Sequence, residues 1–131
     1  MKVRIDFTES TTLECALHDT LLEFNGDFAD CIVTVGAKAD ITFKPRQLPS
    51  PAQQALEHEQ AAVEVDFPEF LRLLCGIVQI VDGHVNVRRP SADREIIIDI
   101  RVVDSSFALI ETDHQGLLQA LQSRLRGERR T

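Results

Sequence analysis

The stretch EIIIDIRVVDSSFALIET, residues 95–112, decides the fold class of this chain. It contains two segments rich in β-branched and other apolar residues, 95–103 and 107–112, on either side of the pair Ser105-Ser106. Apolar runs of this length around a short polar break are typical of two antiparallel strands joined by a tight turn. The stretch therefore predicts a β-hairpin that turns at Ser105-Ser106.

Side chains of the first predicted strand alternate between the two faces of the sheet. One face receives four apolar residues and is interpreted as the core face: Ile96, Ile98, Ile100 and Val102. A two-residue turn would also place Ile110 on the opposite face, directly across from Arg101. The predicted interface consists of the residues on this outward face: Ile97, Asp99, Arg101, Val103 and Ile110.

This outward face is neither cleanly polar nor cleanly apolar. An acid and a base among apolar side chains suit an interface, where a polar contact fixes the register within the buried area. Left exposed, a mixed surface of this size would favour aggregation. The plainer alternative is that the chain's own helices cover both faces of the sheet, and that Asp99 and Arg101 form only a weak ion pair.

Outward from residues 95–112, strand and helix patterns alternate along the chain. Strands are predicted at 3–7, 31–35, 39–43, 63–66, 77–81 and 84–88, with the second and third forming a hairpin. Helices are predicted at 13–24, at 51–61, from 67 onward, and at 113–125, where the helix is amphipathic. The order predicts an α+β fold: a largely antiparallel sheet built from hairpins, with helices packed on one face.

The segment 21–35 allows two assignments because Asn25-Gly26 fits either the end of a helix or a hairpin turn. Five apolar positions before this dipeptide follow helical spacing. We therefore predict a helix here and keep the hairpin as the alternative.

The segment 67–82 also allows two assignments. A continuous helix fits the spacing of its apolar residues, whereas the β-branched run before Asp82-Gly83 favours strands. Asp-Gly is a strong signal for a type I′ turn, which would pair Val81 with His84. We therefore predict a hairpin at this point and keep the continuous helix as the alternative.

Length and charge limit the organisation and the partners. The 131 residues suit a single domain, 1–131, with a surface crossover near 44–52 and a short basic tail at 124–131. The chain carries 14 basic and 21 acidic residues, a formal net charge of −7. An acidic chain lacks the clustered cations that neutralise phosphates, so a nucleic-acid partner is not expected. The acidic excess favours a basic protein partner.

The sequence favours a cytoplasmic location. Its first residues, MKVRIDFTES, contain no apolar segment of a secretory signal, and no run of about 18 apolar residues predicts a membrane span. Cys15, Cys31 and Cys75 are an odd number of cysteines at wide spacings. This pattern predicts reduced structural thiols in place of a disulfide framework.

Motifs for catalysis, cofactors or metals are weak. The chain has no GxSxG, GxGxxG or GxxxxGK[ST] motif and no CxxC pair. Cys15 and His18 lie about one helical turn apart, yet burial is the stronger expectation for a free cysteine. The cluster Glu57-His58-Glu59 would point its side chains in different directions on a helix, so neither a metal nor a cofactor is predicted.

These observations favour a non-enzymatic, acidic interaction module that binds a protein partner, or itself as a homodimer, through the mixed sheet face. Size, acidity and element order are compatible with small bacterial secretion chaperones, adaptors and toxin-immunity or inhibitor proteins. The alternative is a small enzyme or ligand-binding domain with a polar site on the open sheet face. That site would be formed by His84, Arg88, Asp99 and Arg101.

Overall fold

The computed structural model describes residues 1–7, 12–45, 50–59, 61–91 and 93–125. Part of the predicted crossover near 44–52 and most of the basic tail predicted at 124–131 therefore lie outside the described residues. Within the described chain, no helix is both long enough and apolar enough to cross a membrane.

Seven described strands form one sheet in which every pair is antiparallel. Their order across the sheet is β1-β7-β6-β5-β2-β4, and β3 also pairs with β5. The strands are β1 (Lys2–Asp6), β2 (Ile32–Val35), β3 (Asp40–Phe43), β4 (Val63–Asp66), β5 (Ile77–Arg88), β6 (Ile96–Val103) and β7 (Phe107–Thr112).

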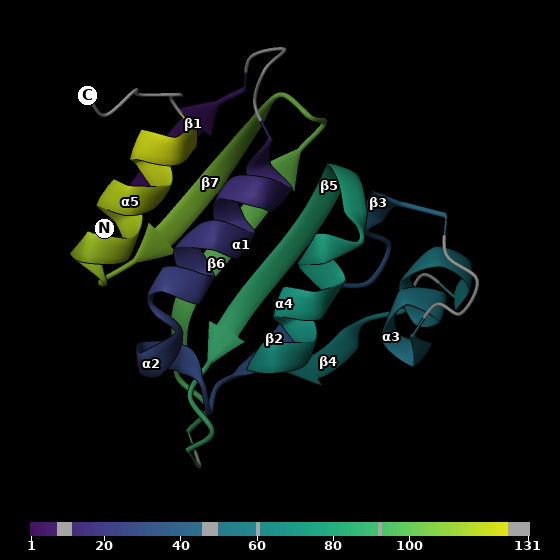
Figure 1. The fold of residues 1–131 in the computed structure, drawn as a ribbon, viewed down its shortest axis with the longest axis horizontal. Helices are drawn as coiled ribbons and strands as arrows, with labels where there is room; N and C mark the ends of the chain where they lie inside the picture. Colours follow the sequence, from purple (N-terminus) through teal and green to yellow (C-terminus); the bar gives the residue numbers. More distant parts are fainter. Residues whose placement is uncertain (8–11, 46–49, 60, 92, 126–131) are drawn as a thin grey trace.

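Three helices lie together on one side of this sheet (Figure 1). They are α1 (Leu13–Glu23), α4 (Phe67–Cys75) and α5 (Gln115–Leu125). The shorter helical segments are α2 (Asn25–Phe28), α3 (Pro51–Gln54) and a π-helical turn, η1 (Ala55–Glu59). The predicted α+β class, the antiparallel sheet, the helices on one face and the C-terminal helix are all confirmed.

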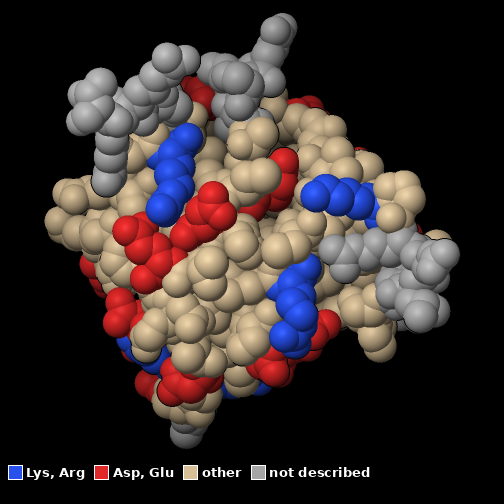
Figure 2. Space-filling view, viewed as in Figure 1, with Lys and Arg blue, Asp and Glu red and all other residues tan. Residues whose placement is uncertain are grey.

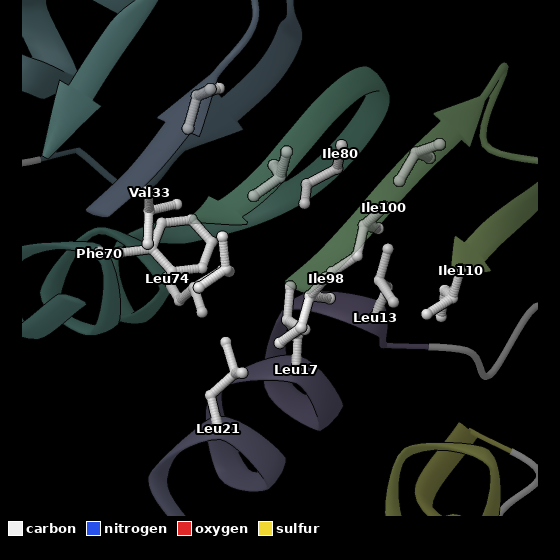
Figure 3. Close-up of a cluster of buried hydrophobic side chains, with 14 of the residues drawn as sticks. Leu13, Leu17, Leu21, Val33, Phe70, Leu74, Ile80, Ile98, Ile100 and Ile110 are labelled. Atoms are coloured by element: carbon white, nitrogen blue, oxygen red, sulfur yellow. The ribbon is translucent and has the colours of Figure 1, made fainter. Parts of the chain in front are cut away.

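The hydrophobic core lies between these helices and one face of the sheet (Figure 3). Leu17 and Leu21 of α1 are each 1 % exposed, and they meet the core side chains of the strands, such as Ile98 at 1 %. Removal of this apolar area from water is the main force that holds the helices to the sheet. The opposite face of the sheet receives no described helix.

Helix starts follow the local chemistry of the sequence. Asp66 caps α4, because its Oδ1 accepts a hydrogen bond from the Glu69 amide at 2.8 Å. Ser50 caps α3 in the same way, with its Oγ accepting from the Gln53 amide at 3.2 Å. The helix predicted over 13–24 is confirmed, but Asn25-Gly26 neither ends it in a left-handed cap nor turns a hairpin: α1 ends at Glu23, and the dipeptide begins α2.

The hairpin predicted at Asp82-Gly83 is wrong, and so is the continuous helix to Val81. Helix α4 ends at Cys75, and β5 then continues as one twelve-residue strand through Asp82-Gly83. The carboxylate of Asp82 contacts a different turn, the one between β6 and β7: its Oδ1 accepts a hydrogen bond from the Asp104 amide at 2.9 Å. Tertiary pairing has overridden the local preference for a turn.

The hairpin predicted between 31–35 and 39–43 is also wrong. β2 and β3 do not pair with each other. Each of them pairs with β5 instead. β2 pairs with the end of β5 and β3 with its beginning, so the two short strands follow one another along a single edge. The break between them contains Lys38, whose φ is 62°.

The predicted β6–β7 hairpin forms, but its register differs by one residue from the prediction. The turn is centred on Asp104 and Ser105, with φ of 53° and 56°, and Val103 pairs with Phe107. Because side chains alternate along a strand, a one-residue shift exchanges the two faces of β7. Ile110 therefore faces the core at 0 % exposure, opposite Ile100, and its assignment to the interface is wrong.

The register can be tested with a matched pair of substitutions on β7. Ile110→Ala should lower the free energy of unfolding by about 2–5 kcal/mol, because it opens a cavity in the core. Leu109→Ala, on the half-buried outward side, should cost much less. Urea denaturation of both variants measures the difference, and equal losses would contradict this register.

The extended conformation of Gly83 has its own test. Gly83 lines a small apolar cavity of about 20 Å³, and a Cβ there would meet Ile80 Cγ2 at 3.5 Å. Gly83→Ala should raise the free energy of unfolding by about 0.5–1 kcal/mol, because alanine loses less backbone entropy in a strand. A type I′ turn would require positive φ at this residue, so a destabilised Gly83→Ala variant would instead support the hairpin.

Candidate functional site

The open face, defined as the sheet face opposite α1, α4 and α5, is the candidate functional site. Two neighbouring rows of side chains cross its centre. The first row contains His84 on β5, Arg101 on β6, Leu109 on β7 and Arg4 on β1. The second row contains Thr34 on β2, Asn86 on β5, Asp99 on β6, Glu111 on β7 and Lys2 on β1.

A polar cluster joins β5 to β6 on this face. His84 Nε2 lies 2.5 Å from Asp99 Oδ1, and Asn86 Nδ2 donates to the same oxygen at 3.2 Å. Arg88 Nε in turn donates to Asn86 Oδ1 at 3.4 Å. Asn86 is 7 % exposed, so these neighbours cover it although it faces away from the helices. The cluster is therefore a connected polar network at the surface of the sheet.

Three of the four residues predicted for a polar site thus come together: His84, Arg88 and Asp99. The fourth, Arg101, is exposed and lies opposite Leu109. The ion pair expected between Asp99 and Arg101 is replaced by the contact between Asp99 and His84. Asn86, which completes the network, was missed because its role depends on its position opposite Asp99.

The predicted interface residues on β6 only partly share the open face. Asp99, Arg101 and Val103 do so, because their pairing partners also point outward. The assignment of Ile96 to the core face is wrong, because a register irregularity between Val87 and Arg88 places it, 46 % exposed, opposite Arg88 on the open face. Ile97 is instead half-buried against the core at the end of the sheet, so its predicted place beside Asp99 needs correction.

A hollow of about 380 Å³ borders the open face where the sheet ends near Ile96. Three carboxylates and several apolar or neutral residues line it: Asp99, Glu111, Asp113, Met1, Ile96, Ile97 and Thr112. Among the described residues, however, no group of three His, Cys, Asp or Glu side chains is arranged to hold a metal ion.

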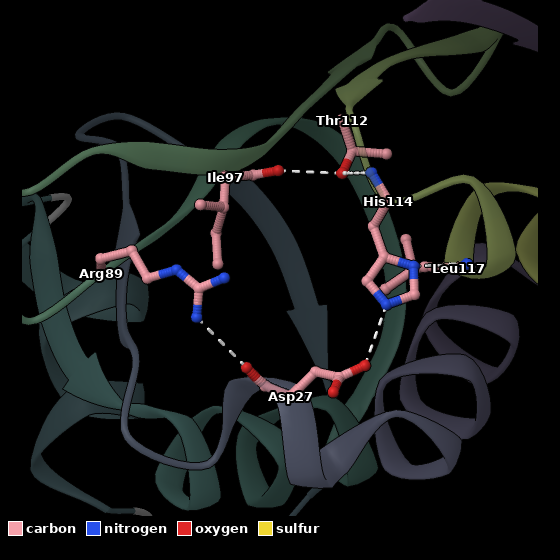
Figure 4. A network of polar contacts seen from close by, with 6 residues as sticks. All are labelled: Asp27, Arg89, Ile97, Thr112, His114 and Leu117. Carbon is pink, nitrogen blue, oxygen red and sulfur yellow. Dashed lines mark hydrogen bonds and ion pairs between the residues drawn. The ribbon is translucent and has the colours of Figure 1, made fainter.

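A second polar network lies on the helix side of the same end of the sheet (Figure 4). His114 Nδ1 accepts a hydrogen bond from the Leu117 amide at 3.0 Å and so caps α5. The other ring nitrogen, Nε2, lies 2.9 Å from Asp27 Oδ2 and acts as the donor in this tautomer. Arg89 also approaches Asp27, at its backbone carbonyl, and Ile97 points into the ring of residues (Figure 4). This network joins α2 to α5 and is structural.

The cysteines divide into one buried and two exposed thiols. All three are free, and Cys31 is 1 % exposed. Burial raises the pKa of the Cys31 thiol, which keeps it neutral and unreactive. Cys15 and Cys75 are exposed, so the expectation that Cys15 packs into the core is wrong.

Charged side chains on the helix side are mixed in sign and scattered among uncharged surface (Figure 2). The open face also carries both signs: Arg101 lies diagonally from Glu111, whereas the two carboxylates Asp99 and Glu111 lie directly opposite each other. Among the described residues, both faces therefore carry charges of both signs.

No known family model, curated protein or solved structure matches this chain.

The His114 cap can be tested by comparing two substitutions. His114→Ala should lower the free energy of unfolding by about 0.5–2 kcal/mol, because it removes the cap and the contact with Asp27. His114→Asn keeps a side-chain acceptor at the cap and should recover part of this loss. His58→Ala, at an exposed position, is the control for loss of a histidine. Equal unfolding energies for His114→Ala and His58→Ala would refute a structural role for His114.

Proposed function

We propose that this protein is a non-enzymatic interaction module that binds a protein through the open face of its sheet. The observation that carries the proposal is the one-sided architecture: α1, α4 and α5 cover one face, and no described helix covers the other. A sheet in such a fold buries only one of its faces, so the second is available to a partner.

The composition of the open face supports a protein partner. Apolar side chains surround the polar cluster, and they are half-buried or exposed: Ile32, Ile96, Val103, Phe107 and Leu109. Apolar groups around a small number of polar contacts are the usual composition of a protein–protein interface. Burial of these groups would supply affinity, whereas the polar contacts would fix the orientation of the partner.

The geometry of the polar cluster favours a positioning role over catalysis. His84, Asn86 and Asp99 already satisfy one another through hydrogen bonds. A prearranged network of this kind can fix the position of a partner along the strands. This role requires no reactive group.

A small enzyme or ligand-binding domain is the second candidate, because a histidine held by a carboxylate is also the arrangement of a general base. The hollow that Asp99 borders, however, is lined by Glu111, Thr112 and Asp113, and His84 is not among its lining residues. This separation favours the interaction module.

Site-specific photo-cross-linking tests the proposed function. A benzoylphenylalanine at Leu109 would lie on the open face, whereas one at Leu22, 53 % exposed on α1, is a matched control on the helix side. In the native cells, irradiation should produce a protein adduct from position 109 and not from position 22. Equal or absent adducts at the two positions would overturn the proposal, and the adduct mass identifies the class of partner.

A further inference from the structure

We propose that the occupant of the open face is a second copy of this chain, packed sheet against sheet about a twofold axis that passes over β6 between Asp99 and Arg101. This inference rests on the proposed function and specifies its partner.

The argument starts from the order of outward side chains along β6. They are apolar Ile96, acidic Asp99, basic Arg101 and apolar Val103. When this order is reversed, apolar residues again occupy the ends and the two charges exchange places. Two antiparallel copies of β6 would therefore place each charge against its opposite.

The symmetry operation makes each of these contacts twice. A twofold axis that lies between the two faces, perpendicular to β6, carries Arg101 of one copy over Asp99 of the other. The same rotation carries Val103 over Ile96. Such an interface is isologous, which is the commonest arrangement of soluble homodimers, and two sheets also pack face to face with nearly aligned strands in β-sandwiches.

The two charged side chains are available for this contact. Arg101 is exposed, and no described residue forms a hydrogen bond or ion pair with its guanidinium. Asp99 receives His84 and Asn86 on the same atom, Oδ1. Its other oxygen, Oδ2, can therefore accept from the guanidinium of a second copy while the polar cluster stays intact.

The charge pattern favours a second copy over a basic partner. Arg88 and Arg101 lie on the open face beside Asp99 and Glu111, so the face carries both signs in neighbouring positions. A uniformly basic partner would meet these arginines with like charge, which opposes association. The centre of the face, where Asp99 and Arg101 are outward neighbours on β6, instead complements its own rotated copy.

Light scattering coupled to size-exclusion chromatography gives the primary test. The wild-type chain should elute with twice its 14.7 kDa mass. Arg101→Asp should weaken the dimer at least ~100-fold, because the twofold axis places the like-charged contact in the interface twice. Arg72→Asp, which changes an exposed charge on α4, is the control and should leave the dimer unchanged.

Charge exchange distinguishes a direct contact from damage to the fold. Asp99→Arg should also be monomeric, yet mixed with the Arg101→Asp variant it should form a heterodimer, because all four facing charges are then complementary. The double variant carrying both substitutions should dimerise alone. Failure of both the mixture and the double variant to associate, with circular dichroism showing folded chains, would overturn the proposed contact.

A disulfide test does not depend on a change at Asp99. In a chain with Cys15→Ser and Cys75→Ser, an Ile96→Cys variant mixed with a Val103→Cys variant should form an intermolecular disulfide. Either variant alone should form much less. Equal yields from the mixture and from the single variants would contradict the twofold arrangement.

The outcomes separate this inference from the proposed function. A monomeric wild-type chain at ~100 μM, with Leu109 cross-links to a different protein, would overturn the self-association and leave the interaction module standing. A monomer without cross-links at Leu109 would overturn both.

Discussion

The continuous extended backbone of β5 is the constraint on which the rest of the structure depends. At its Val85–Arg88 end this strand pairs with β2 on one edge and β6 on the other. Its first half pairs with β3, and the Val81 carbonyl accepts a hydrogen bond from the Ser105 amide of the β6–β7 turn. If β5 folded back at Asp82-Gly83, these pairings would be lost together, and buried backbone groups would lose their partners.

The one-sided cover of the sheet follows from this arrangement. The return of the chain through α1, α4 and α5 brings three helices to the same face, where the inward side chains of the strands are mostly apolar. The other face carries a mixture of apolar and charged side chains. Its central polar groups form hydrogen bonds with one another and not with a helix. His84, Asn86 and Asp99 satisfy one another there. The asymmetry between the two faces is what gives the molecule a candidate binding surface.

The polar groups of the molecule serve two different tasks. At the end of the sheet, His114 caps α5 and contacts Asp27, so its ring fixes the relative position of two helical segments. On the open face, the Asp99 carboxylate is shared among strands and remains partly accessible, with 29 % of its side chain exposed. A histidine beside a carboxylate occurs in both places. Only the surroundings of each pair separate a structural contact from a candidate site.

The sequence by itself determined the fold class, the helix starts at Ser50 and Asp66, and the outward position of Asp99, Arg101 and Val103, because these depend on local periodicity and capping. The tertiary structure alone decided the continuity of β5, the inward position of Ile110 and the network around Asn86. Each of these depends on which strand lies alongside: neighbouring strands held Asp82-Gly83 extended, and the turn at Asp104-Ser105 shifted the register of β7. Such pairings join residues far apart in sequence, and their energies exceed the local preferences that the sequence pattern reports.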